Sequence, residues 1–338
     1  MICTTKTPLR VSLFGGGTDY PAYFRRSPGA VIGFAIDKYI YISALKLGGY
    51  VDYRYRLSYS QLEQADSIDA IEHPVVRTLL KHYGWDEPTD FSIMADMPAS
   101  AGLGSSSAFT VGFVNLMSNL LAIPRNRMEL AREAIFTEQE LLKENVGVQD
   151  QLHATFGGIN RFDFSGDNYR ITPINISGVA LKTLTDCMVL VFTGIKRRAT
   201  QIVAQQVENT SAKKIDGQLG DLLKLVDQAQ GVLESRDDVE RLPHRIAEML
   251  HESWIIKKKL AANVTLNEID ELYEFCLANG ALGGKLCGAG GGGFLLMVVP
   301  PEKRARFEEA VGPRRCVSFQ IDPHGTQFFG QHTFPERR

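Results

Sequence analysis

The first hundred residues alternate apolar and polar positions in a way that predicts strands and one short helix. Residues 31–47 alternate apolar and β-branched side chains with polar ones, and residues 50–60 repeat this alternation. Such a period of two is typical of β-strands. Residues 90–96 predict a further strand, and residues 74–83 predict a helix that begins at a proline, a residue favoured in the first helical turn.

Two helices are predicted next. Residues 105–121 are largely apolar and predict a helix that Pro124 prevents from continuing. Residues 126–144 are charged but carry recurring apolar residues, so they predict a second helix.

The second half again changes from strand to helix. Residues 187–193 form a compact apolar strand, and residues 200–262 predict helices broken around Pro243. Thr265 and Glu268 have the spacing of a capping box at the start of a helix. The remaining predicted elements are the end of that helix at about Ala278 with Gly280 as its stop signal, a strand over 294–299, a helix over 301–311 and a strand near 316–321.

This order predicts two α+β domains. Strands precede helices in each half, which favours one domain over about residues 1–170 and another over about 180–330, joined within 160–185.

Composition and charge exclude several classes of protein. The 338 residues include 37 Lys and Arg against 39 Asp and Glu, so the net charge of −2 provides no field that would attract nucleic acid. No apolar run approaches the roughly 18–20 residues that span a bilayer, and no signal peptide is recognisable. The sequence therefore predicts a cytoplasmic globular protein without a membrane or nucleic-acid partner, and it is compatible with a homodimer.

The cysteines argue against a disulfide scaffold or a zinc site. Their number is odd and none forms a CxxC pair, so buried reduced thiols are expected. They are Cys3, Cys187, Cys276, Cys287 and Cys316.

Residues 98–108, PASAGLGSSSA, are the sharpest candidate for a binding site. Gly102 and Gly104 would let the backbone approach a bulky anion, and the serines that follow start a helix, whose N–H groups and dipole favour phosphate. A serine hydroxyl there can also reach a magnesium ion. An ordinary serine N-cap after a flexible loop is the alternative, and the segment is no Walker A loop because no Gly-Lys-Ser/Thr follows.

Two other glycine-rich segments are candidates. Residues 8–20, PLRVSLFGGGTDY, place Arg10 on a strand and Asp19 at its exit, as in a small-molecule site or in a tight hairpin capped by Asp19. Residues 283–293, GGKLCGAGGGG, are rich in glycine, which loses much backbone entropy when the chain folds. So many glycines suggest that the backbone of this segment closely approaches a ligand or the other domain. A flexible loop is the alternative for this segment.

A pair of carboxylates completes the candidates. Glu138 and Asp150 flank a helix end, so that one could hold a metal while the other takes a proton. Two acidic residues on a charged helix are also typical of a solvated face, and Glu140 and Glu144 compete for the metal role.

Together the segments resemble the GHMP kinase superfamily, named for galactokinase, homoserine kinase, mevalonate kinase and phosphomevalonate kinase. PLRVSLFGGGTDY, PASAGLGSSSA and KLCGAGGGGF resemble its three motifs and occur in the family's order. The resemblance implies an N-terminal domain like the second domain of ribosomal protein S5, a ferredoxin-like C-terminal domain and an active site in the cleft between them. It also implies ATP and Mg²⁺ as cofactors.

The same resemblance implies the roles of individual residues. Asp150 would be the catalytic aspartate, with Arg10 beside it to stabilise the negative charge of the transferred phosphoryl group. Ser106 and Glu138 would hold the magnesium, and the twelve-residue spacing to Asp150 favours Glu138 over Glu140. The residues expected around the ATP phosphates are Gly102, Leu103, Gly104, Ser105, Ser106, Ser107 and Ala108. The residues expected at the substrate are Gly16, Gly17, Thr18, Asp19, Gly288, Ala289, Gly290 and Gly291.

The sequence GGGTDY resembles the branch of the family that contains the heptose 7-phosphate kinases, with the fucokinases nearby. This implies a sugar phosphate substrate that is phosphorylated on its anomeric hydroxyl for capsule or related surface polysaccharide. Arg197 and Arg198 are candidates for binding the phosphate of that substrate, with Arg25 and Arg26 as competitors and a solvated basic turn as the alternative. A fucokinase-type enzyme, a diphosphomevalonate decarboxylase and a non-catalytic sugar-binding regulator are the rival functions.

Overall fold

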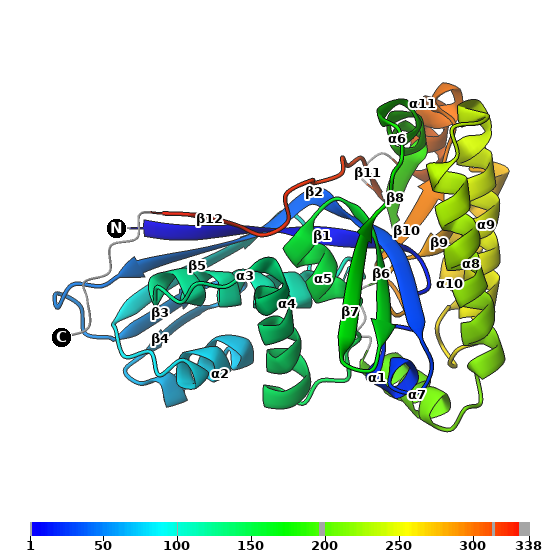
Figure 1. Cartoon of the computed structure of the whole chain (residues 1–338). Helices are drawn as coiled ribbons and strands as arrows, with labels where there is room; N and C mark the ends of the chain where they lie inside the picture. Colours follow the sequence, from blue (N-terminus) through cyan, green and yellow to red (C-terminus); the bar gives the residue numbers. More distant parts are fainter. Residues whose placement is uncertain (1, 100, 196–199, 313–314, 331–338) are drawn as a thin grey trace.

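The computed structural model describes residues 2–99, 101–195, 200–312 and 315–330. It contains an eight-stranded sheet built mainly from the N-terminal half and a four-stranded sheet from the C-terminal half (Figure 1). Helices pack on both sheets, so the predicted α+β class is confirmed.

Strand β2, Gly29–Lys46, is the centre of the larger sheet. One edge pairs with β1, Ile2–Phe14, while along the other edge β2 pairs first with β6, Ile159–Ser165, and then with β5, Thr89–Ala95. The register of β1 with β2 shifts between Pro8 and Leu9. The other strands of this half are β3, Tyr55–Ser58, β4, Leu62–Ala65, and β7, Asn168–Pro173.

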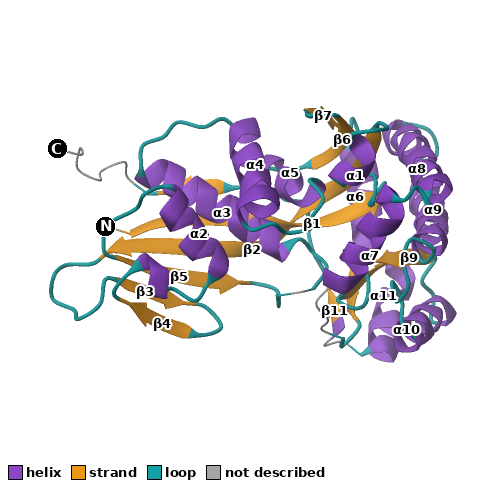
Figure 2. Ribbon diagram, turned by 90° about the horizontal axis from the view of Figure 1, so that it is seen from below, coloured by secondary structure: helices purple, strands orange, loops and turns teal. Residues whose placement is uncertain are grey.

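Four helices cover one face of the larger sheet (Figures 1 and 2). Helix α3, Ser105–Leu120, runs through the middle of this layer, and its contacts with β1 and β2 bury nearly all of its side chains, which explains its apolar sequence. A short helix α1, Pro21–Phe24, follows the first glycine turn. The covering helices are α2, Pro74–His82, α3, Ser105–Leu120, α4, Arg127–Phe136, and α5, Gln149–Phe156.

The smaller sheet has the order β11-β8-β10-β9. Strand β8, Met188–Phe192, is buried on both faces: Val189 and Val191 join one hydrophobic cluster, and Met188 and Leu190 join another. Burial on both faces explains why this strand has no polar alternation. The other strands are β9, Gly283–Leu286, β10, Phe294–Val298, and β11, Cys316–Val317.

Helices of the C-terminal half link the two sheets. Helix α8, Asp216–Glu234, packs on β1, β2 and helix α9, and α9, Leu242–Lys257, packs on β9. Pro243 lies in the first turn of α9, so the helical run breaks over 235–241 rather than at the proline. The remaining helices are α6, Gly178–Cys187, α7, Thr200–Ser211, α10, Asn267–Ala278, and α11, Pro301–Val311.

Outside the cavity described below, three local predictions differ from the structure. Thr265 caps no helix: its hydroxyl bonds Asp270, and the N-cap of α10 is Leu266. Residues 50–54 form no strand, and only Cys316–Val317 of the segment 316–321 belongs to one.

The segment after β11 returns to the larger sheet. Strand β12, Gln327–Phe329, pairs with β1, and the Thr326 hydroxyl lies 2.8 Å from that of Thr7. The buried Asp322 carboxylate accepts hydrogen bonds from the Tyr39 hydroxyl and from two backbone N–H groups. The predicted second domain, 180–330, therefore contributes its last strand to the first sheet.

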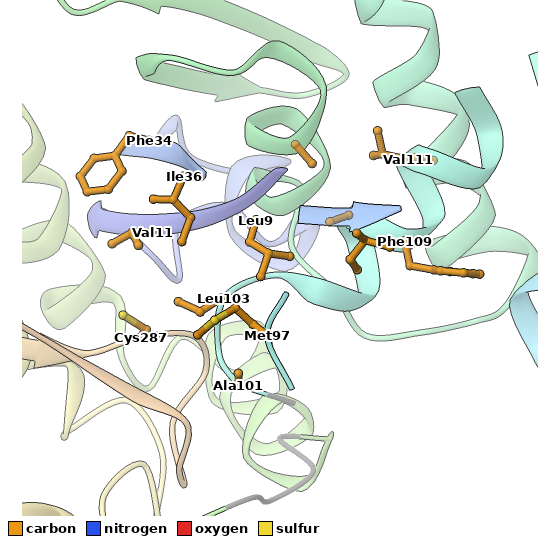
Figure 3. Close-up of a cluster of buried hydrophobic side chains, with 14 of the residues drawn as sticks. Leu9, Val11, Phe34, Ile36, Met97, Ala101, Leu103, Phe109, Val111 and Cys287 are labelled. Carbon is orange, nitrogen blue, oxygen red and sulfur yellow. The ribbon is translucent and has the colours of Figure 1, made fainter. Parts of the chain in front are cut away.

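The main hydrophobic core crosses from one half to the other. In Figure 3, Cys287 from the loop after β9 lies close to Leu103, and both belong to the same hydrophobic cluster as Ala101 and Val11. All five cysteines are free, and four of them are buried. Among the described residues, none of the helices combines the length and hydrophobicity of a membrane-spanning segment.

Candidate active site

A cavity of about 250 Å³ lies where all three glycine-rich segments meet. Its walls come from β1 and the turn after it, the start of α3, the start of α5, the end of α9 and the loop after β9. Of the residues predicted from sequence, those that line it are Arg10, Gly16, Gly17, Asp19, Gly102, Gly104, Ser105, Ser106, Ser107, Asp150, Gly288 and Ala289.

Arg10 and Asp150 form a bidentate ion pair in this cavity. Arg10 Nε donates to Asp150 Oδ1 at 2.8 Å, and Nη2 donates to Oδ2 at 2.7 Å. Arg10 Nη1 donates to the Gly102 carbonyl at 2.7 Å, so the guanidinium is fixed by three bonds. Arg10 is buried, whereas the Asp150 side chain keeps 24% exposure toward the cavity. The pair holds a carboxylate in one orientation, open to a ligand.

The serine-rich segment starts α3 as the sequence indicated. Gly104 is the N-cap with φ +72°, a left-handed conformation that favours glycine. The N–H groups of the first turn therefore face the cavity without a capping side chain, which suits an anion. Leu103 and Ala108 are buried instead of lining the cavity: the Leu103 carbonyl accepts from Arg10 N, and Ala108 lies in the core.

The glycine-rich loop after β9 contacts the loop before α3. A Cβ on Gly288 would lie 2.6 Å from Gly102 Cα, and one on Gly293 would lie 2.4 Å from the Ala101 carbonyl oxygen. Close approach to the other half therefore explains the glycines. Gly290 and Gly291, expected at the substrate, pack against Val264 outside the cavity.

Asp19 is held inside the cavity wall. Its Oδ1 accepts from Gly17 N and its Oδ2 from Gln149 Nε2, both at 2.9 Å. Burial raises the pKa of Asp19. Thr18, also expected at the substrate, points away: its hydroxyl bonds the Gly15 and Ala30 carbonyls and ties the turn to β2. Gln149 is a wall residue that sequence reasoning missed, although it adjoins Asp150.

Glu138 lies behind the serine segment. It sits in a π-helical turn, Thr137–Leu141, that replaces the end of the predicted helix, and only 1% of it is exposed. Its Oε2 accepts from Ser107 Oγ at 2.9 Å and from Gln151 Nε2 at 2.5 Å, while its buried Oε1 has no hydrogen-bond partner among the described residues. Burial raises the pKa of Glu138 to about 7.

These residues fit a magnesium ion. A hydroxyl and a carboxylate oxygen are hard ligands of the kind that Mg²⁺ takes, and Glu138 Oε1 accepts no hydrogen bond from the described residues. Ser106 is exposed in the cavity wall. Glu140, the rival, is exposed and pairs with Lys143 at 3.2 Å. Within the described ranges no three His, Cys, Asp or Glu side chains gather as ligands, so phosphate oxygens would complete the site.

Glu138→Gln should therefore lower turnover at limiting magnesium by at least about tenfold, because the neutral amide loses the charge that draws a divalent cation. Ser106→Ala should act in the same direction. Glu140→Gln is the matched control, since it removes an exposed charge two residues away. Steady-state rates over a magnesium titration test this, and normal turnover in Glu138→Gln with a loss in Glu140→Gln would reverse the choice of ligand.

Two buried lysines in the cavity wall were, like Gln149, not among the site residues predicted from sequence. Lys257, at the end of α9, and Lys285, in β9, both line the cavity. Lys257 stands in a run of three lysines that is typical of a solvated helix face. Lys285 is the first residue of the KLCGAGGGGF segment, and this position is the only feature of the sequence that indicates a place for it in the site.

The basic residues proposed from sequence lie elsewhere. Arg197 and Arg198 fall outside the described residues. Arg26 pairs with Asp216 on the surface, and Arg25 lines a neighbouring hollow that shares Tyr20, Asn145 and Val146 with the main cavity.

Comparison with known proteins decides the family. The family model for the GHMP kinases N terminal domain matches residues 70–158, and that for GHMP kinases C terminal matches residues 236–317. The chain is 30% identical to the D-glycero-alpha-D-manno-heptose 7-phosphate kinase of Campylobacter jejuni, over 91% of this chain and 92% of that protein. The chain belongs to the GHMP kinases. It is an ATP-dependent phosphotransferase, as the sequence predicted.

Solved structures agree on the fold of this kinase. A D-glycero-D-manno-heptose 1-phosphate kinase from Bacteroides thetaiotaomicron superposes with a TM-score of 0.77 at 22% identity, covering 98% of this chain and all of that one. Lactococcus lactis galactokinase complexed with galactose gives 0.70 at 19% identity, over 97% of this chain and 95% of that one. The predicted two-part GHMP kinase fold is thus confirmed.

Proposed function

We propose that this kinase transfers the γ-phosphoryl group of ATP to the anomeric hydroxyl of D-glycero-D-manno-heptose 7-phosphate. The product would be the 1,7-bisphosphate, used in the synthesis of surface polysaccharide such as capsule. The observation that carries the proposal is the Asp150 carboxylate, held by Arg10 and open to a cavity at the start of α3. The 30% identical relative, itself named as a heptose 7-phosphate kinase, supports the choice of sugar.

In this proposal Asp150 lies beside the accepting hydroxyl. It takes the proton of that hydroxyl or orients the oxygen for attack, and Arg10 fixes the carboxylate in either case. Phosphoryl transfer needs positioning and neutralisation of charge more than covalent catalysis. Asp19, with both carboxylate oxygens already bonded, would present its remaining lone pairs to sugar hydroxyls.

The nucleotide phosphates would lie against the start of α3. Gly102 and Gly104 keep the backbone close, and the N–H groups of Ser105–Ser107 supply donors at the positive end of the helix dipole. Bound Mg²⁺ would neutralise phosphate charge, with Ser106 and Glu138 as its protein ligands.

The test is a coupled kinase assay with a panel of phosphorylated and free sugars. We expect kcat/KM for heptose 7-phosphate to exceed that for free heptose by about 10–150-fold, the scale of hydrogen bonds to a charged group. Free fucose is included because a fucokinase-type enzyme would prefer it. Equal values for phosphorylated and free heptose would contradict the substrate assignment, and no turnover with any sugar would favour a non-catalytic sugar-binding protein.

A further inference from the structure

Lys257 and Lys285 bring two further cations into a cavity where Asp19 and Asp150, the carboxylates that line it among the described residues, hydrogen-bond to other groups. Lys257 is 9% exposed and Lys285 3%. Their ammonium groups donate only to backbone carbonyls: Lys257 Nζ to Leu286 at 3.0 Å and to Gly288, and Lys285 Nζ to Leu13 at 2.8 Å. Neither forms an ion pair within the part of the chain that the structure describes.

The carboxylates that line the same cavity are already engaged. Asp150 forms an ion pair with Arg10, and the carboxylate of Asp19 accepts hydrogen bonds from Gly17 N and the Gln149 side chain. Burial lowers the pKa of Lys257 to about 7 and that of Lys285 to about 8, and Lys285 and Arg10 add repulsion at Lys257. Buried charges in proteins are normally paired. The positive charges of Lys257 and Lys285 therefore lack a negatively charged partner in the described part of the chain, which a bound anion would supply.

The N–H donors of the two lysines that have no acceptor among the described residues also indicate a site for an anion. An ammonium group has three N–H donors. Lys285, with one acceptor, retains two, and Lys257, with two acceptors, retains one. A group with several acceptor oxygens and more than one negative charge would satisfy all of them, and a phosphate monoester is such a group.

The position of the lysines favours the sugar over the nucleotide. Lys285 bonds the Leu13 carbonyl directly before the turn that carries Asp19, and the charge of Asp19 acts on Lys257. The start of α3 has its own donors for nucleotide phosphates. We propose that Lys257 and Lys285 bind the phosphate group that the acceptor sugar already carries, and so select phosphorylated sugars. This inference rests on the proposed function.

The kinetic test compares Lys257→Met, Lys285→Met and the double variant with Lys258→Met. Lys258 is the matched control because it adjoins Lys257 but pairs with Asp270 and lies over the Trp254 ring. We expect the double variant to lose about 10–100-fold in the ratio of kcat/KM for heptose 7-phosphate to kcat/KM for free heptose, with ATP affinity by calorimetry retained. Should the Met variants fail to fold by circular dichroism, Lys257→Gln and Lys285→Gln replace them.

Two outcomes of this comparison overturn the inference. An equal loss for both sugars with weakened ATP binding would assign the lysines to the nucleotide. An unchanged preference for the phosphorylated sugar would remove them from its phosphate, and a loss of preference in Arg197→Ala/Arg198→Ala instead would place that role on the arginines.

A binding measurement separates this inference from the choice of sugar. Inorganic phosphate is titrated calorimetrically into the kinase saturated with a non-hydrolysable ATP analogue, so that the positions of all three nucleotide phosphates are occupied. Binding by the wild-type protein and by Lys258→Met, with at least about tenfold weaker binding by the double variant, supports the anion site even if heptose 7-phosphate is not turned over. Absence of phosphate binding by the wild-type protein, or equal binding by all variants, contradicts it.

Discussion

Replacing Asp150 by asparagine is expected to lower turnover by about 10²- to 10⁴-fold, the usual contribution of a general base. The amide keeps the shape of the carboxylate and one hydrogen bond from Arg10, but it loses the negative charge and the basicity. ATP affinity should change little, because the nucleotide phosphates would lie on the glycine–serine segment before α3. Turnover rates beside calorimetric ATP binding test the prediction.

The control is Asp221→Asn on the exposed side of α8, which should leave both quantities unchanged. Thermal unfolding of both variants shows whether the loss at Asp150 is one of folding. A decrease of less than tenfold in a folded Asp150→Asn protein would exclude a central role for this carboxylate.

A single methyl group at Gly288 is expected to have the second largest effect. Gly288 has φ +68°, and a Cβ there would lie 2.6 Å from Gly102 Cα, which is backbone and cannot rotate away. The glycine loop and the loop before α3 would have to separate, and an error of about 1 Å at a reacting centre can cost about 10²-fold in rate. We expect Gly288→Ala to lose at least that factor in turnover.

Gly231→Ala is the matched control for this substitution. Gly231 lies in α8, and a Cβ there meets no atom within 4 Å. It should keep full activity and gain up to about 1 kcal/mol of stability, because alanine favours a helix over glycine. Denaturant unfolding and turnover of the two variants test the contrast, and wild-type activity in Gly288→Ala would show that the contact between the loops is dispensable.

Elements set by neighbouring residues could be predicted from the sequence. The start of α3 depends on the left-handed Gly104 and the serines after it, and β8 shows its burial on both faces as an unbroken apolar run. The family resemblance also implied that Arg10 lies beside Asp150, and in the structure the two side chains form an ion pair.

Features set by distant contacts could not be predicted. Lys257 looks like its two neighbours in the run of lysines, and only the packing of α9 on β9 turns its side chain toward the glycine loop. Thr18 carries the family's motif, but two carbonyls of the turn and of β2 accept its hydroxyl and hold it out of the cavity. The π-helical turn at Glu138 likewise could not be predicted from the spacing of apolar residues along a regular helix.

The return of residues 319–329 to the first sheet has a consequence for how the protein is made. A ribosome synthesises β1 near the beginning and β12 some three hundred residues later, yet the two strands pair. Until Asp322 emerges, the N–H of Gly158 lacks its carbonyl acceptor and the Tyr39 hydroxyl its carboxylate. An N-terminal half that folds before β12 is synthesised would leave the β1 edge unpaired at Thr4–Lys6, and unpaired strand edges are where folding intermediates aggregate.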